Sequence, residues 1–222
     1  MGTLFIVATP IGNLADMTLR AIETLKSVDF VLCEDTRNTQ KLLNHFEIST
    51  KTLSYHQHSD TRKVQEILQH LQEGKNLALV TDAGTPGISD PGNLLVQFLA
   101  ASAVPVEVVP IPGASAVIAA LSISGFATDK FLFLGFPPHK NKRQKFFQIV
   151  ADSDYTTAFY ESSHRIGKAI DALTQVLDTN RKVCVCRELT KKFETVYRGT
   201  MLQLHEMKIP DKGEFVIVVE GK

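Results

Sequence analysis

Short continuous apolar runs alternate along the first half of the chain with stretches whose apolar residues recur at helical spacing. Four such runs lie at residues 4–8, 30–33, 77–80 and 106–109. Each is typical of a strand that is buried on both faces of a parallel sheet. Val64, Ile67, Leu68 and Leu71 instead follow the i, i+3, i+4, i+7 pattern of an amphipathic helix. This strand–helix order predicts an α/β fold with a mostly parallel, doubly wound sheet.

The pattern changes after a predicted helix at residues 114–124. From there on, strands are predicted at residues 131–136, 157–160, 182–187, 194–198 and 214–220. A basic loop at 137–143 and a helix at 166–177 lie between the first of them. Because the later strands follow one another with few helices, we expect a mixed sheet in this half. We therefore predict two α/β domains, residues 1–113 and 114–222, that pack closely and leave a cofactor cleft between them.

Turn-forming residues follow each predicted strand of the first half. The four loops span residues 9–13, 34–37, 82–92 and 112–116. Ligands of open α/β sheets bind beyond the carboxyl ends of the strands, so these loops indicate a binding site. The P-loop motif is absent and no G-x-G-x-x-G motif follows a strand, which weakens the ATPase and dinucleotide-dehydrogenase interpretations. Asp90 and Pro91 are predicted to begin the next helix, as its cap and first residue.

Charge is balanced over the whole chain but not along it. The 222 residues include 24 Lys and Arg against 24 Asp and Glu, and 44% of the residues are hydrophobic. This composition excludes a disordered chain, a coiled coil and a collagen-like fibre. Residues 1–130 hold 9 basic and 13 acidic residues, whereas residues 131–222 hold 15 and 11. The second half could therefore present a basic face to a polyanion.

The cysteines and the N-terminus bear on the compartment. The three cysteines are Cys33, Cys184 and Cys186, and an odd count without a signal peptide favours a reducing compartment. Cys184 and Cys186 are expected on one side of a strand as small hydrophobic residues. No apolar run approaches the ~18 residues of a membrane-spanning helix. We expect a soluble, cytoplasmic protein without a membrane partner.

Several loop motifs carry a resemblance to a known family. They are T-P-I-G-N at 9–13, E-D-T-R at 34–37, D-A-G-T-P-G-I-S-D-P-G at 82–92, F-Y-E-S-S-H-R-I at 159–166, R-E-L-T-K at 187–191 and G-E-F at 213–215. Together they resemble the signatures of the tetrapyrrole methylase superfamily. Within it, they are most similar to the branch that methylates small-subunit ribosomal RNA. The resemblance spans nearly the whole chain, and the motif at 82–92 is long and specific.

The resemblance implies a concrete activity. Members of this branch transfer a methyl group from S-adenosylmethionine to the ribose 2′-hydroxyl of a cytidine in 16S ribosomal RNA, near the decoding centre. They have two α/β domains with the cofactor in the cleft, and they form homodimers. The partner would then be 16S ribosomal RNA or the small ribosomal subunit. Two alternatives stay open, namely a methylase of a small, tetrapyrrole-like molecule and a non-catalytic nucleotide-binding module.

The resemblance also implies cofactor contacts from the loops of both halves. Gly84 and Gly87 would let the backbone approach a ligand closely, and backbone amides could recognise a carboxylate or an adenine edge. The expected cofactor-binding residues are Pro10, Ile11, Asp82, Gly84, Thr85, Ile88, Ser115, Ala116 and Tyr160. The alternative for these positions is a structural role, as turns, helix caps or packing residues.

Methyl transfer from a sulfonium is an in-line displacement, in which alignment of the reactants can supply much of the catalysis. Because a ribose hydroxyl is a weak nucleophile, a general base would help. Asp35, Glu34 and His58 are the candidate bases, and Asp35 and His58 are the predicted catalytic residues. Asp35 could instead cap a helix, and His58 could be a solvated loop residue. Glu34 could pair with Arg37.

Basic residues supply the expected RNA contacts, because arginine suits bidentate phosphate binding. The expected substrate-binding residues are Glu34, Arg37, His56, Lys140, Lys142, Arg143, Arg165 and Arg187. Lys145 extends the basic run, which could also be an ordinary solvated surface. Glu161 and Glu188 are expected to organise the arginines. We expect no metal site.

Overall fold

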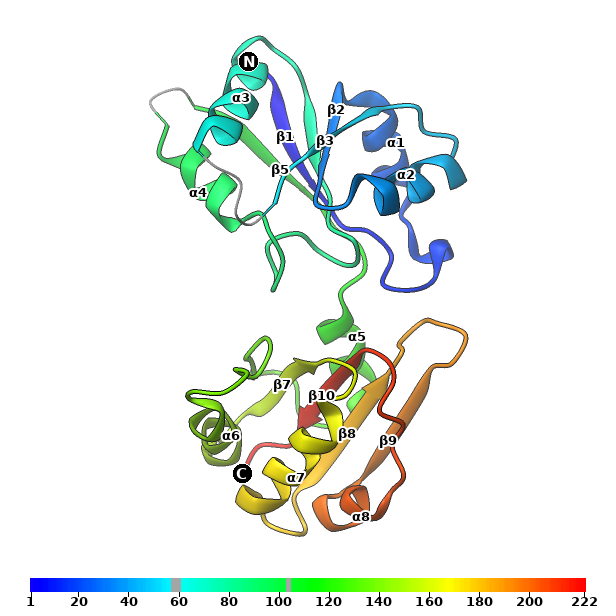
Figure 1. Ribbon diagram of the computed structural model, residues 1–222, viewed down its shortest axis with the longest axis vertical. Coiled ribbons are helices and arrows are strands. Elements are labelled where there is room, and N and C mark those ends of the chain that lie inside the picture. Colours follow the sequence, from blue (N-terminus) through cyan, green and yellow to red (C-terminus); the bar gives the residue numbers. More distant parts are fainter. Residues whose placement is uncertain (57–60, 103–104) are drawn as a thin grey trace. The chain divides into compact units, whose positions relative to one another are not determined.

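The computed structural model describes residues 1–56, 61–102 and 105–222. The chain divides into two compact units, Met1–Ser115 and Ala116–Lys222, which are coloured blue to green and green to red in Figure 1. Each unit has its own sheet and its own hydrophobic core.

Unit 1 is built on a parallel sheet of five strands. In the order β3-β2-β4-β1-β5, these are β1 (Thr3–Val7), β2 (Phe30–Cys33), β3 (Lys51–Ser54), β4 (Leu77–Leu79) and β5 (Glu107–Ile111). Every pair of neighbours is parallel, which confirms the predicted sheet. Strand β3 was not predicted from the sequence. It lies at the edge of the sheet and contributes a single apolar residue, Leu53, so its pattern is weak.

Helices cover both faces of this sheet (Figure 1). They are η1 (Leu14–Asp16), α1 (Leu19–Ser27), α2 (Thr36–His45), α3 (Thr61–Gln72) and α4 (Asn93–Ala100). Residues of α1 and α2, such as Leu25 and Leu43, form one core with Val31 of the sheet. Residues of α3 and α4, such as Leu71 and Leu95, form the other core. The unit is therefore doubly wound, as predicted.

Helix α4 begins later than the sequence predicted. Asp90 and Pro91 were expected to start it, but the first helical residue is Asn93 and the capping residue is Gly92. Gly92 has a φ of 143°, a conformation that residues with a Cβ rarely adopt. The peptide before it folds back, because the carbonyl of Pro91 accepts a hydrogen bond from the amide of Gly87 at 3.2 Å. Asp90 is thereby freed from a capping role.

Unit 2 contains a mixed five-stranded sheet in the order β6-β7-β10-β8-β9. The strands are β6 (Phe131–Phe133), β7 (Thr156–Glu161), β8 (Lys182–Arg187), β9 (Thr195–Thr200) and β10 (Phe215–Val219). Only β6 and β7 pair in parallel, and the other pairs are antiparallel. The predicted mixed sheet is therefore confirmed, and with it the α/β fold class. Cys184 and Cys186 both lie buried on β8 with their sulfur atoms 3.7 Å apart, as expected.

The helices of unit 2 are α5 (Ala116–Ser124), α6 (Arg143–Asp152), α7 (Ile166–Val176) and α8 (Met201–Glu206). Helix α6 corrects the prediction of a basic run confined to a loop, because Arg143 and Lys145 already belong to its first turn. Phe146 and Phe147 of α6 pack against Phe159 of β7 in the core. No helix in the described ranges is long and apolar enough to cross a membrane.

One edge of the second sheet collects most of its long loops. Strands β6 and β7 run in the same direction, and β8 shares it because β7 and β8 are both antiparallel to β10. The segments after these three strands, together with the segment that leads into β10, therefore lie at one edge. We call this the loop edge of unit 2 and define it by residues 134–142, 162–165, 188–194 and 211–214.

Candidate cofactor and substrate site

Three loops at the carboxyl edge of the first sheet are tied together by hydrogen bonds. Thr9 after β1 and Gly84 after β4 form a two-way backbone bridge, with N–O distances of 2.9 and 3.0 Å. The Thr9 hydroxyl also donates to the carbonyl of Thr81 at 3.0 Å. The Thr85 hydroxyl donates to the carbonyl of Ala114, after β5, at 3.2 Å. These bonds fix the predicted ligand loops as one surface, where ligands of open α/β sheets bind.

Two glycines give the loop after β4 its course. Gly84 and Gly87 have φ values of 84° and 82°, where residues with a Cβ are strained. A Cβ on Gly87 would lie 2.6 Å from Oδ1 of Asn93, and one on Gly84 would lie 3.5 Å from Cγ2 of Ile11. Both glycines are thus required by the fold itself. A Gly84→Val substitution would strain the backbone even without a ligand, and it therefore cannot report on cofactor binding alone.

The same loop offers free hydrogen-bond donors. Within the described part of the chain, the amides of Ala83 and Thr85 donate to no acceptor. Their side chains are small, and Ala83 is exposed. Free amides beside small side chains suit the carboxylate or the adenine edge of a nucleoside cofactor. The loop can therefore accept polar groups of a nucleoside ligand, as the resemblance implies.

The predicted cofactor residues differ in exposure. Pro10, Ile11 and Gly84 are buried, whereas Asp82 and Ile88 are exposed, and Asp82 accepts a hydrogen bond from Asn38 at 3.1 Å. The half-buried residues are Thr85, Ser115, Ala116 and Tyr160. Ser115 ends unit 1 and Ala116 begins α5, while Tyr160 lies on β7 with its ring 4.9 Å from that of Phe133. Their contacts with a cofactor stay predictions.

Asp35, a predicted catalytic residue, has a clear structural role. Its Oδ1 accepts a hydrogen bond from the amide of Arg37 at 2.8 Å and thereby caps α2. Its Oδ2 pairs with the guanidinium of Arg37 at 3.0 Å. The hydrogen bonds from Arg37, side chain first and then amide, lower the pKa of Asp35 to about 2. A carboxylate this acidic is a weak proton acceptor at neutral pH, so the geometry favours the capping alternative.

Asp90 is a residue that sequence reasoning missed. Burial raises the pKa of its carboxyl, the nearby charges of Glu34 and Asp82 raise it further, and a hydrogen bond with Thr81 opposes them. Asp90 therefore holds a proton more readily than an ordinary aspartate does. The sequence showed Asp90 only as a helix start, because its burial depends on the loop folding back before Gly92.

The two histidine predictions have different outcomes. His56 is exposed, and its Nε2 lies 2.8 Å from the hydroxyl of Ser54 at the end of β3. His58 lies outside the described residues.

Arg37 and Lys41 line an open depression of about 420 Å³ on α2, together with Thr52 of β3. Glu34 is exposed. The ion pair with Arg37 that was expected of Glu34 is formed by Asp35 instead.

Buried Glu161 organises two of the predicted RNA-binding arginines. Its carboxylate lies 3.2 Å from the guanidinium of Arg143 and 3.3 Å from Nε of Arg165. Both arginines also donate to the loop after β6, Arg143 to the carbonyl of Pro138 at 3.3 Å and Arg165 to that of Pro137 at 2.6 Å. The expected role of Glu161 is confirmed. The guanidinium groups hold the loop in place, so less of their hydrogen-bonding capacity is left for RNA.

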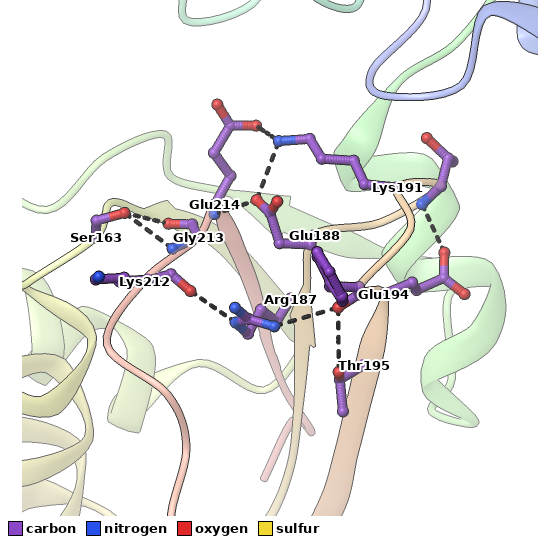
Figure 2. A network of polar contacts seen from close by, with 11 residues as sticks. Ser163, Arg187, Glu188, Lys191, Glu194, Thr195, Lys212, Gly213 and Glu214 are labelled. Carbon is purple, nitrogen blue, oxygen red and sulfur yellow. Dashed lines mark hydrogen bonds and ion pairs between the residues drawn. The ribbon is translucent and has the colours of Figure 1, made fainter.

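Glu188 was expected to organise an arginine, but its ion-pair partner is a lysine. Lys191 donates to Glu188 at 3.0 Å and to Glu214 at 2.8 Å, as Figure 2 shows. Arg187 instead donates to two backbone carbonyls, those of Lys212 at 2.7 Å and Phe193 at 3.2 Å. Arg187 thus stabilises two neighbouring loops.

The lysines of the basic run are the accessible cations of this region. Lys140, Lys142 and Lys145 are exposed, and none has an ion-pair partner among the residues that the structure describes. Lys140 and Lys142 belong to the loop edge of unit 2, and Lys145 lies on α6. In the described ranges, no group of three or more His, Cys, Asp and Glu residues could hold a metal ion.

The sequence matches known methylases over most of its length. The family model "Tetrapyrrole (Corrin/Porphyrin) Methylases" matches residues 3–205. A Synechocystis protein named "Ribosomal RNA small subunit methyltransferase I" is 50% identical over 100% of this chain and 80% of its own length. A Bacillus subtilis protein of the same name is 44% identical over 100% of the chain and 76% of its own length.

Solved structures of more distant proteins share the fold. The methyltransferase CobJ has a TM-score of 0.73 at 15% identity and covers 100% of this chain and 95% of its own. The cobalamin biosynthetic enzyme cobalt precorrin-4 methyltransferase has a TM-score of 0.71 at 19% identity, with 98% and 94% covered. At this identity the similarity establishes the architecture alone.

Proposed function

Because the chain belongs to the tetrapyrrole (corrin/porphyrin) methylase family, we propose that it transfers the methyl group of S-adenosylmethionine to small-subunit ribosomal RNA. The observation that carries the proposal is the match to relatives named for this activity, at 44–50% identity over nearly the whole chain. The structures of tetrapyrrole enzymes match at only 15–19% identity, so they favour no small-molecule substrate.

The target atom of the proposal is the 2′-hydroxyl of a cytidine in 16S ribosomal RNA, near the decoding centre. S-adenosylmethionine, when bound, would supply an electrophilic methyl group for in-line displacement by the hydroxyl oxygen. The hydroxyl proton must leave as the O–C bond forms. Asp35 is poorly suited to take it, since its pKa is about 2. Asp90, whose pKa is raised by burial, is a further candidate base beside His58.

The loop at residues 82–92 would hold the cofactor in this proposal. The free amides of Ala83 and Thr85 would donate to its polar groups, and exposed Ile88 would cover apolar surface. Calorimetry should detect binding of S-adenosylmethionine to the wild-type chain. Heat of binding that disappears on addition of the demethylated product would show that both compete for one site.

The resemblance also supports an assembly and a compartment. We propose that two copies form a homodimer, as members of this branch do, and that the dimer acts in the cytoplasm, where ribosomal RNA is matured. Most soluble homo-oligomers have closed two-fold symmetry. Light scattering should give about twice the mass of 24.5 kDa, and a mass of one chain at micromolar concentration would contradict the dimer.

Alkaline hydrolysis tests the proposed target atom directly. Hydroxide cleaves RNA through attack of the 2′-oxygen on the neighbouring phosphate, so methylation of that oxygen blocks cleavage at one bond. The purified chain should be incubated with small-subunit particles and S-adenosylmethionine that carries a radioactive methyl group. The RNA of the particles should then be hydrolysed. The label should remain in an alkali-resistant dinucleotide that contains cytidine. Label in mononucleotides would instead indicate methylation of a base.

A further inference from the structure

An exposed aromatic ring stands on the loop between β8 and β9. Phe193 is 66% exposed, more than any other phenylalanine in the described ranges. Lys192 lies beside it, with Nζ 5.7 Å from the ring centroid. Burying such a ring would gain free energy, but single exposed apolar residues are common on protein surfaces. The case for a ligand therefore rests on the contacts and charges around the ring.

The backbone that carries Phe193 is held in place from several sides. The carbonyl of Phe193 accepts hydrogen bonds from Arg187 and from the Thr195 hydroxyl, each at 3.2 Å. On the other side of the loop, Glu194 accepts a hydrogen bond from the amide of Thr190 at 2.6 Å. In Figure 2, the dashed lines from Arg187 and Thr195 meet at one oxygen atom, and that of Glu194 runs to the other side of the loop.

A second set of contacts ties the loop to the segment before β10. Lys191 bridges the carboxylates of Glu188 and Glu214. The amide of Glu188 donates to the carbonyl of Glu214 at 2.9 Å, and the amide of Glu214 donates to the carboxylate of Glu188 at 2.8 Å. The Ser163 hydroxyl joins the loop after β7 to Gly213 at 2.8 and 2.9 Å. The ring of Phe193 is therefore presented on a rigid support.

The loop also contains backbone strain. Glu188 and Thr190 have φ values of 52° and 66°, and a positive φ is unusual for a β-branched residue such as Thr190. The hydroxyl of Thr190 is buried and has no hydrogen-bond partner in the described part of the chain. Strain of this kind persists where surrounding contacts impose it, and it is frequent at ligand sites.

Exposed lysines at this edge suit a polyanion as the partner of Phe193, and the acidic residue exposed beside the ring is Glu194. Lys192 is exposed and has no ion-pair partner among the described residues. Lys140 and Lys142 are exposed at the same loop edge of unit 2. A planar aromatic ring beside an unpaired lysine suits a single-stranded nucleic acid, whose base stacks on the ring while a phosphate contacts Lys192.

We propose that Phe193 is a stacking platform for an unpaired base of the RNA substrate, and that Arg187 positions it through the Phe193 carbonyl. The proposal rests on the proposed RNA methyltransferase function and adds a contact to it. Stacking of one base on an aromatic side chain tolerates any base, and an uncharged ring neutralises no phosphate, so it adds nothing to the salt slope. The platform would therefore hold one nucleotide of the substrate and leave sequence recognition to other contacts.

The absence of tryptophan from the sequence makes the proposal directly measurable. Phe193→Trp places a single indole at the platform and preserves an aromatic ring. Addition of a single-stranded RNA oligonucleotide from the small-subunit sequence should quench its fluorescence, because a stacked base is an efficient quencher. Leu202→Trp is the matched control, since Leu202 is 52% exposed on α8, away from the loop edge. Its fluorescence should change little.

Binding of the same RNA to Phe193→Ala gives the second measurement. Loss of one stacked base should weaken binding roughly 5- to 150-fold, and the slope of log affinity against log salt should stay unchanged. Lys192→Ala should instead flatten that slope by about 0.7 for a single strand. Arg187→Lys, which keeps the charge but loses the two-carbonyl geometry, should reproduce part of the Phe193→Ala defect.

The outcomes separate this proposal from the proposed function. Phe193→Trp that is not quenched, together with wild-type affinity of Phe193→Ala, would overturn the platform even if the wild-type chain methylates ribosomal RNA normally. Failure of the wild-type chain to bind or methylate ribosomal RNA would overturn the proposed function and the platform with it. Quenching at Phe193→Trp but not at Leu202→Trp, with an affinity loss in Phe193→Ala, would support the platform.

Discussion

Arg165 pairs with the fully buried carboxylate of Glu161, with Nε 3.3 Å from Oε1, at the carboxyl end of β7. The same carboxylate binds Arg143 at the start of α6. Through these two arginines, one buried charge determines the course of the loop at Pro137 and Pro138. The accessible lysines that follow in this loop are thus positioned from the interior of unit 2.

Removal of the buried charge should destabilise unit 2. Glu161→Gln keeps the shape of the side chain but leaves two arginines, each less than one-fifth exposed, without their counter-charge. We expect the free energy of unfolding to fall by roughly 3 kcal/mol, as when a buried ion pair loses one partner. Urea denaturation measures the change. Asp152→Asn, which removes an exposed pair with Lys222, should cost less than about 1 kcal/mol; equal effects of the two variants would contradict the assignment.

The contribution of Asp35 to stability should be present at neutral pH and lost in acid. Its pKa is about 2 in the folded chain, below its ordinary value of 3.8. The folded state therefore favours the carboxylate, and this contribution is fully present above pH 3.8 and lost as the pH falls towards 2. The melting temperatures of wild type and Asp35→Asn should differ by a constant amount near neutrality and converge in acid. Asp35→Asn should also keep the pH profile of methyl transfer near neutrality, and a shifted profile would restore Asp35 as the base.

Asp90 should change the stability of the protein with pH in the opposite direction to Asp35. Its pKa is raised above 3.8, mainly by burial, so the folded chain holds the proton more tightly than the unfolded chain does. Ionisation of Asp90 then costs stability above its folded pKa, and this cost disappears as the pH falls to 3.8. Asp90→Asn should melt at a higher temperature than wild type at neutral pH but not in acid. If Asp90 also takes the hydroxyl proton, single-turnover transfer should fall roughly 10²- to 10⁴-fold.

The lysines of the basic run can be tested without disturbing the fold. Lys140, Lys142 and Lys145 are exposed, whereas Arg143 is bound to Glu161, so the variant should spare Arg143. The triple Ala variant should bind RNA more weakly and flatten the plot of log affinity against log salt by about 0.7 to 0.9 per lost phosphate contact. Its affinity for S-adenosylmethionine should not change. An unaltered salt slope would identify this run as an ordinary solvated surface.

The regular elements of unit 1 could be predicted because their cause is local. Strands β1, β2 and β4 are apolar runs, and two-face burial requires such runs. Strand β3 (Lys51–Ser54) was missed because an edge strand buries less surface and therefore needs no continuous apolar run.

Helix α8 of unit 2 was also missed, although its sequence carries a signal. Thr200 and Gln203 have the residue types and the spacing of a capping box, which the structure forms.

The chemistry of the site was less predictable, because it depends on contacts between distant residues. The sequence could place Asp35 before a helix, but the pairing of its side chain with Arg37 decides the pKa. Glu161 and Arg143 are 18 residues apart, and the folding of α6 against β7 brings them together. Phe193 carried no signal, since exposure of an aromatic residue cannot be seen in its neighbours along the chain.

The central claim, that this chain is a ribosomal RNA methyltransferase, is tested most directly by offering it both substrate classes at once. The purified chain should be incubated with methyl-labelled S-adenosylmethionine, small ribosomal subunits that lack the modification, and a tetrapyrrole such as uroporphyrinogen. We predict that the label enters the small-subunit RNA and that the tetrapyrrole stays unlabelled. Label in the tetrapyrrole alone, or binding of the cofactor without transfer to the RNA, would contradict the account.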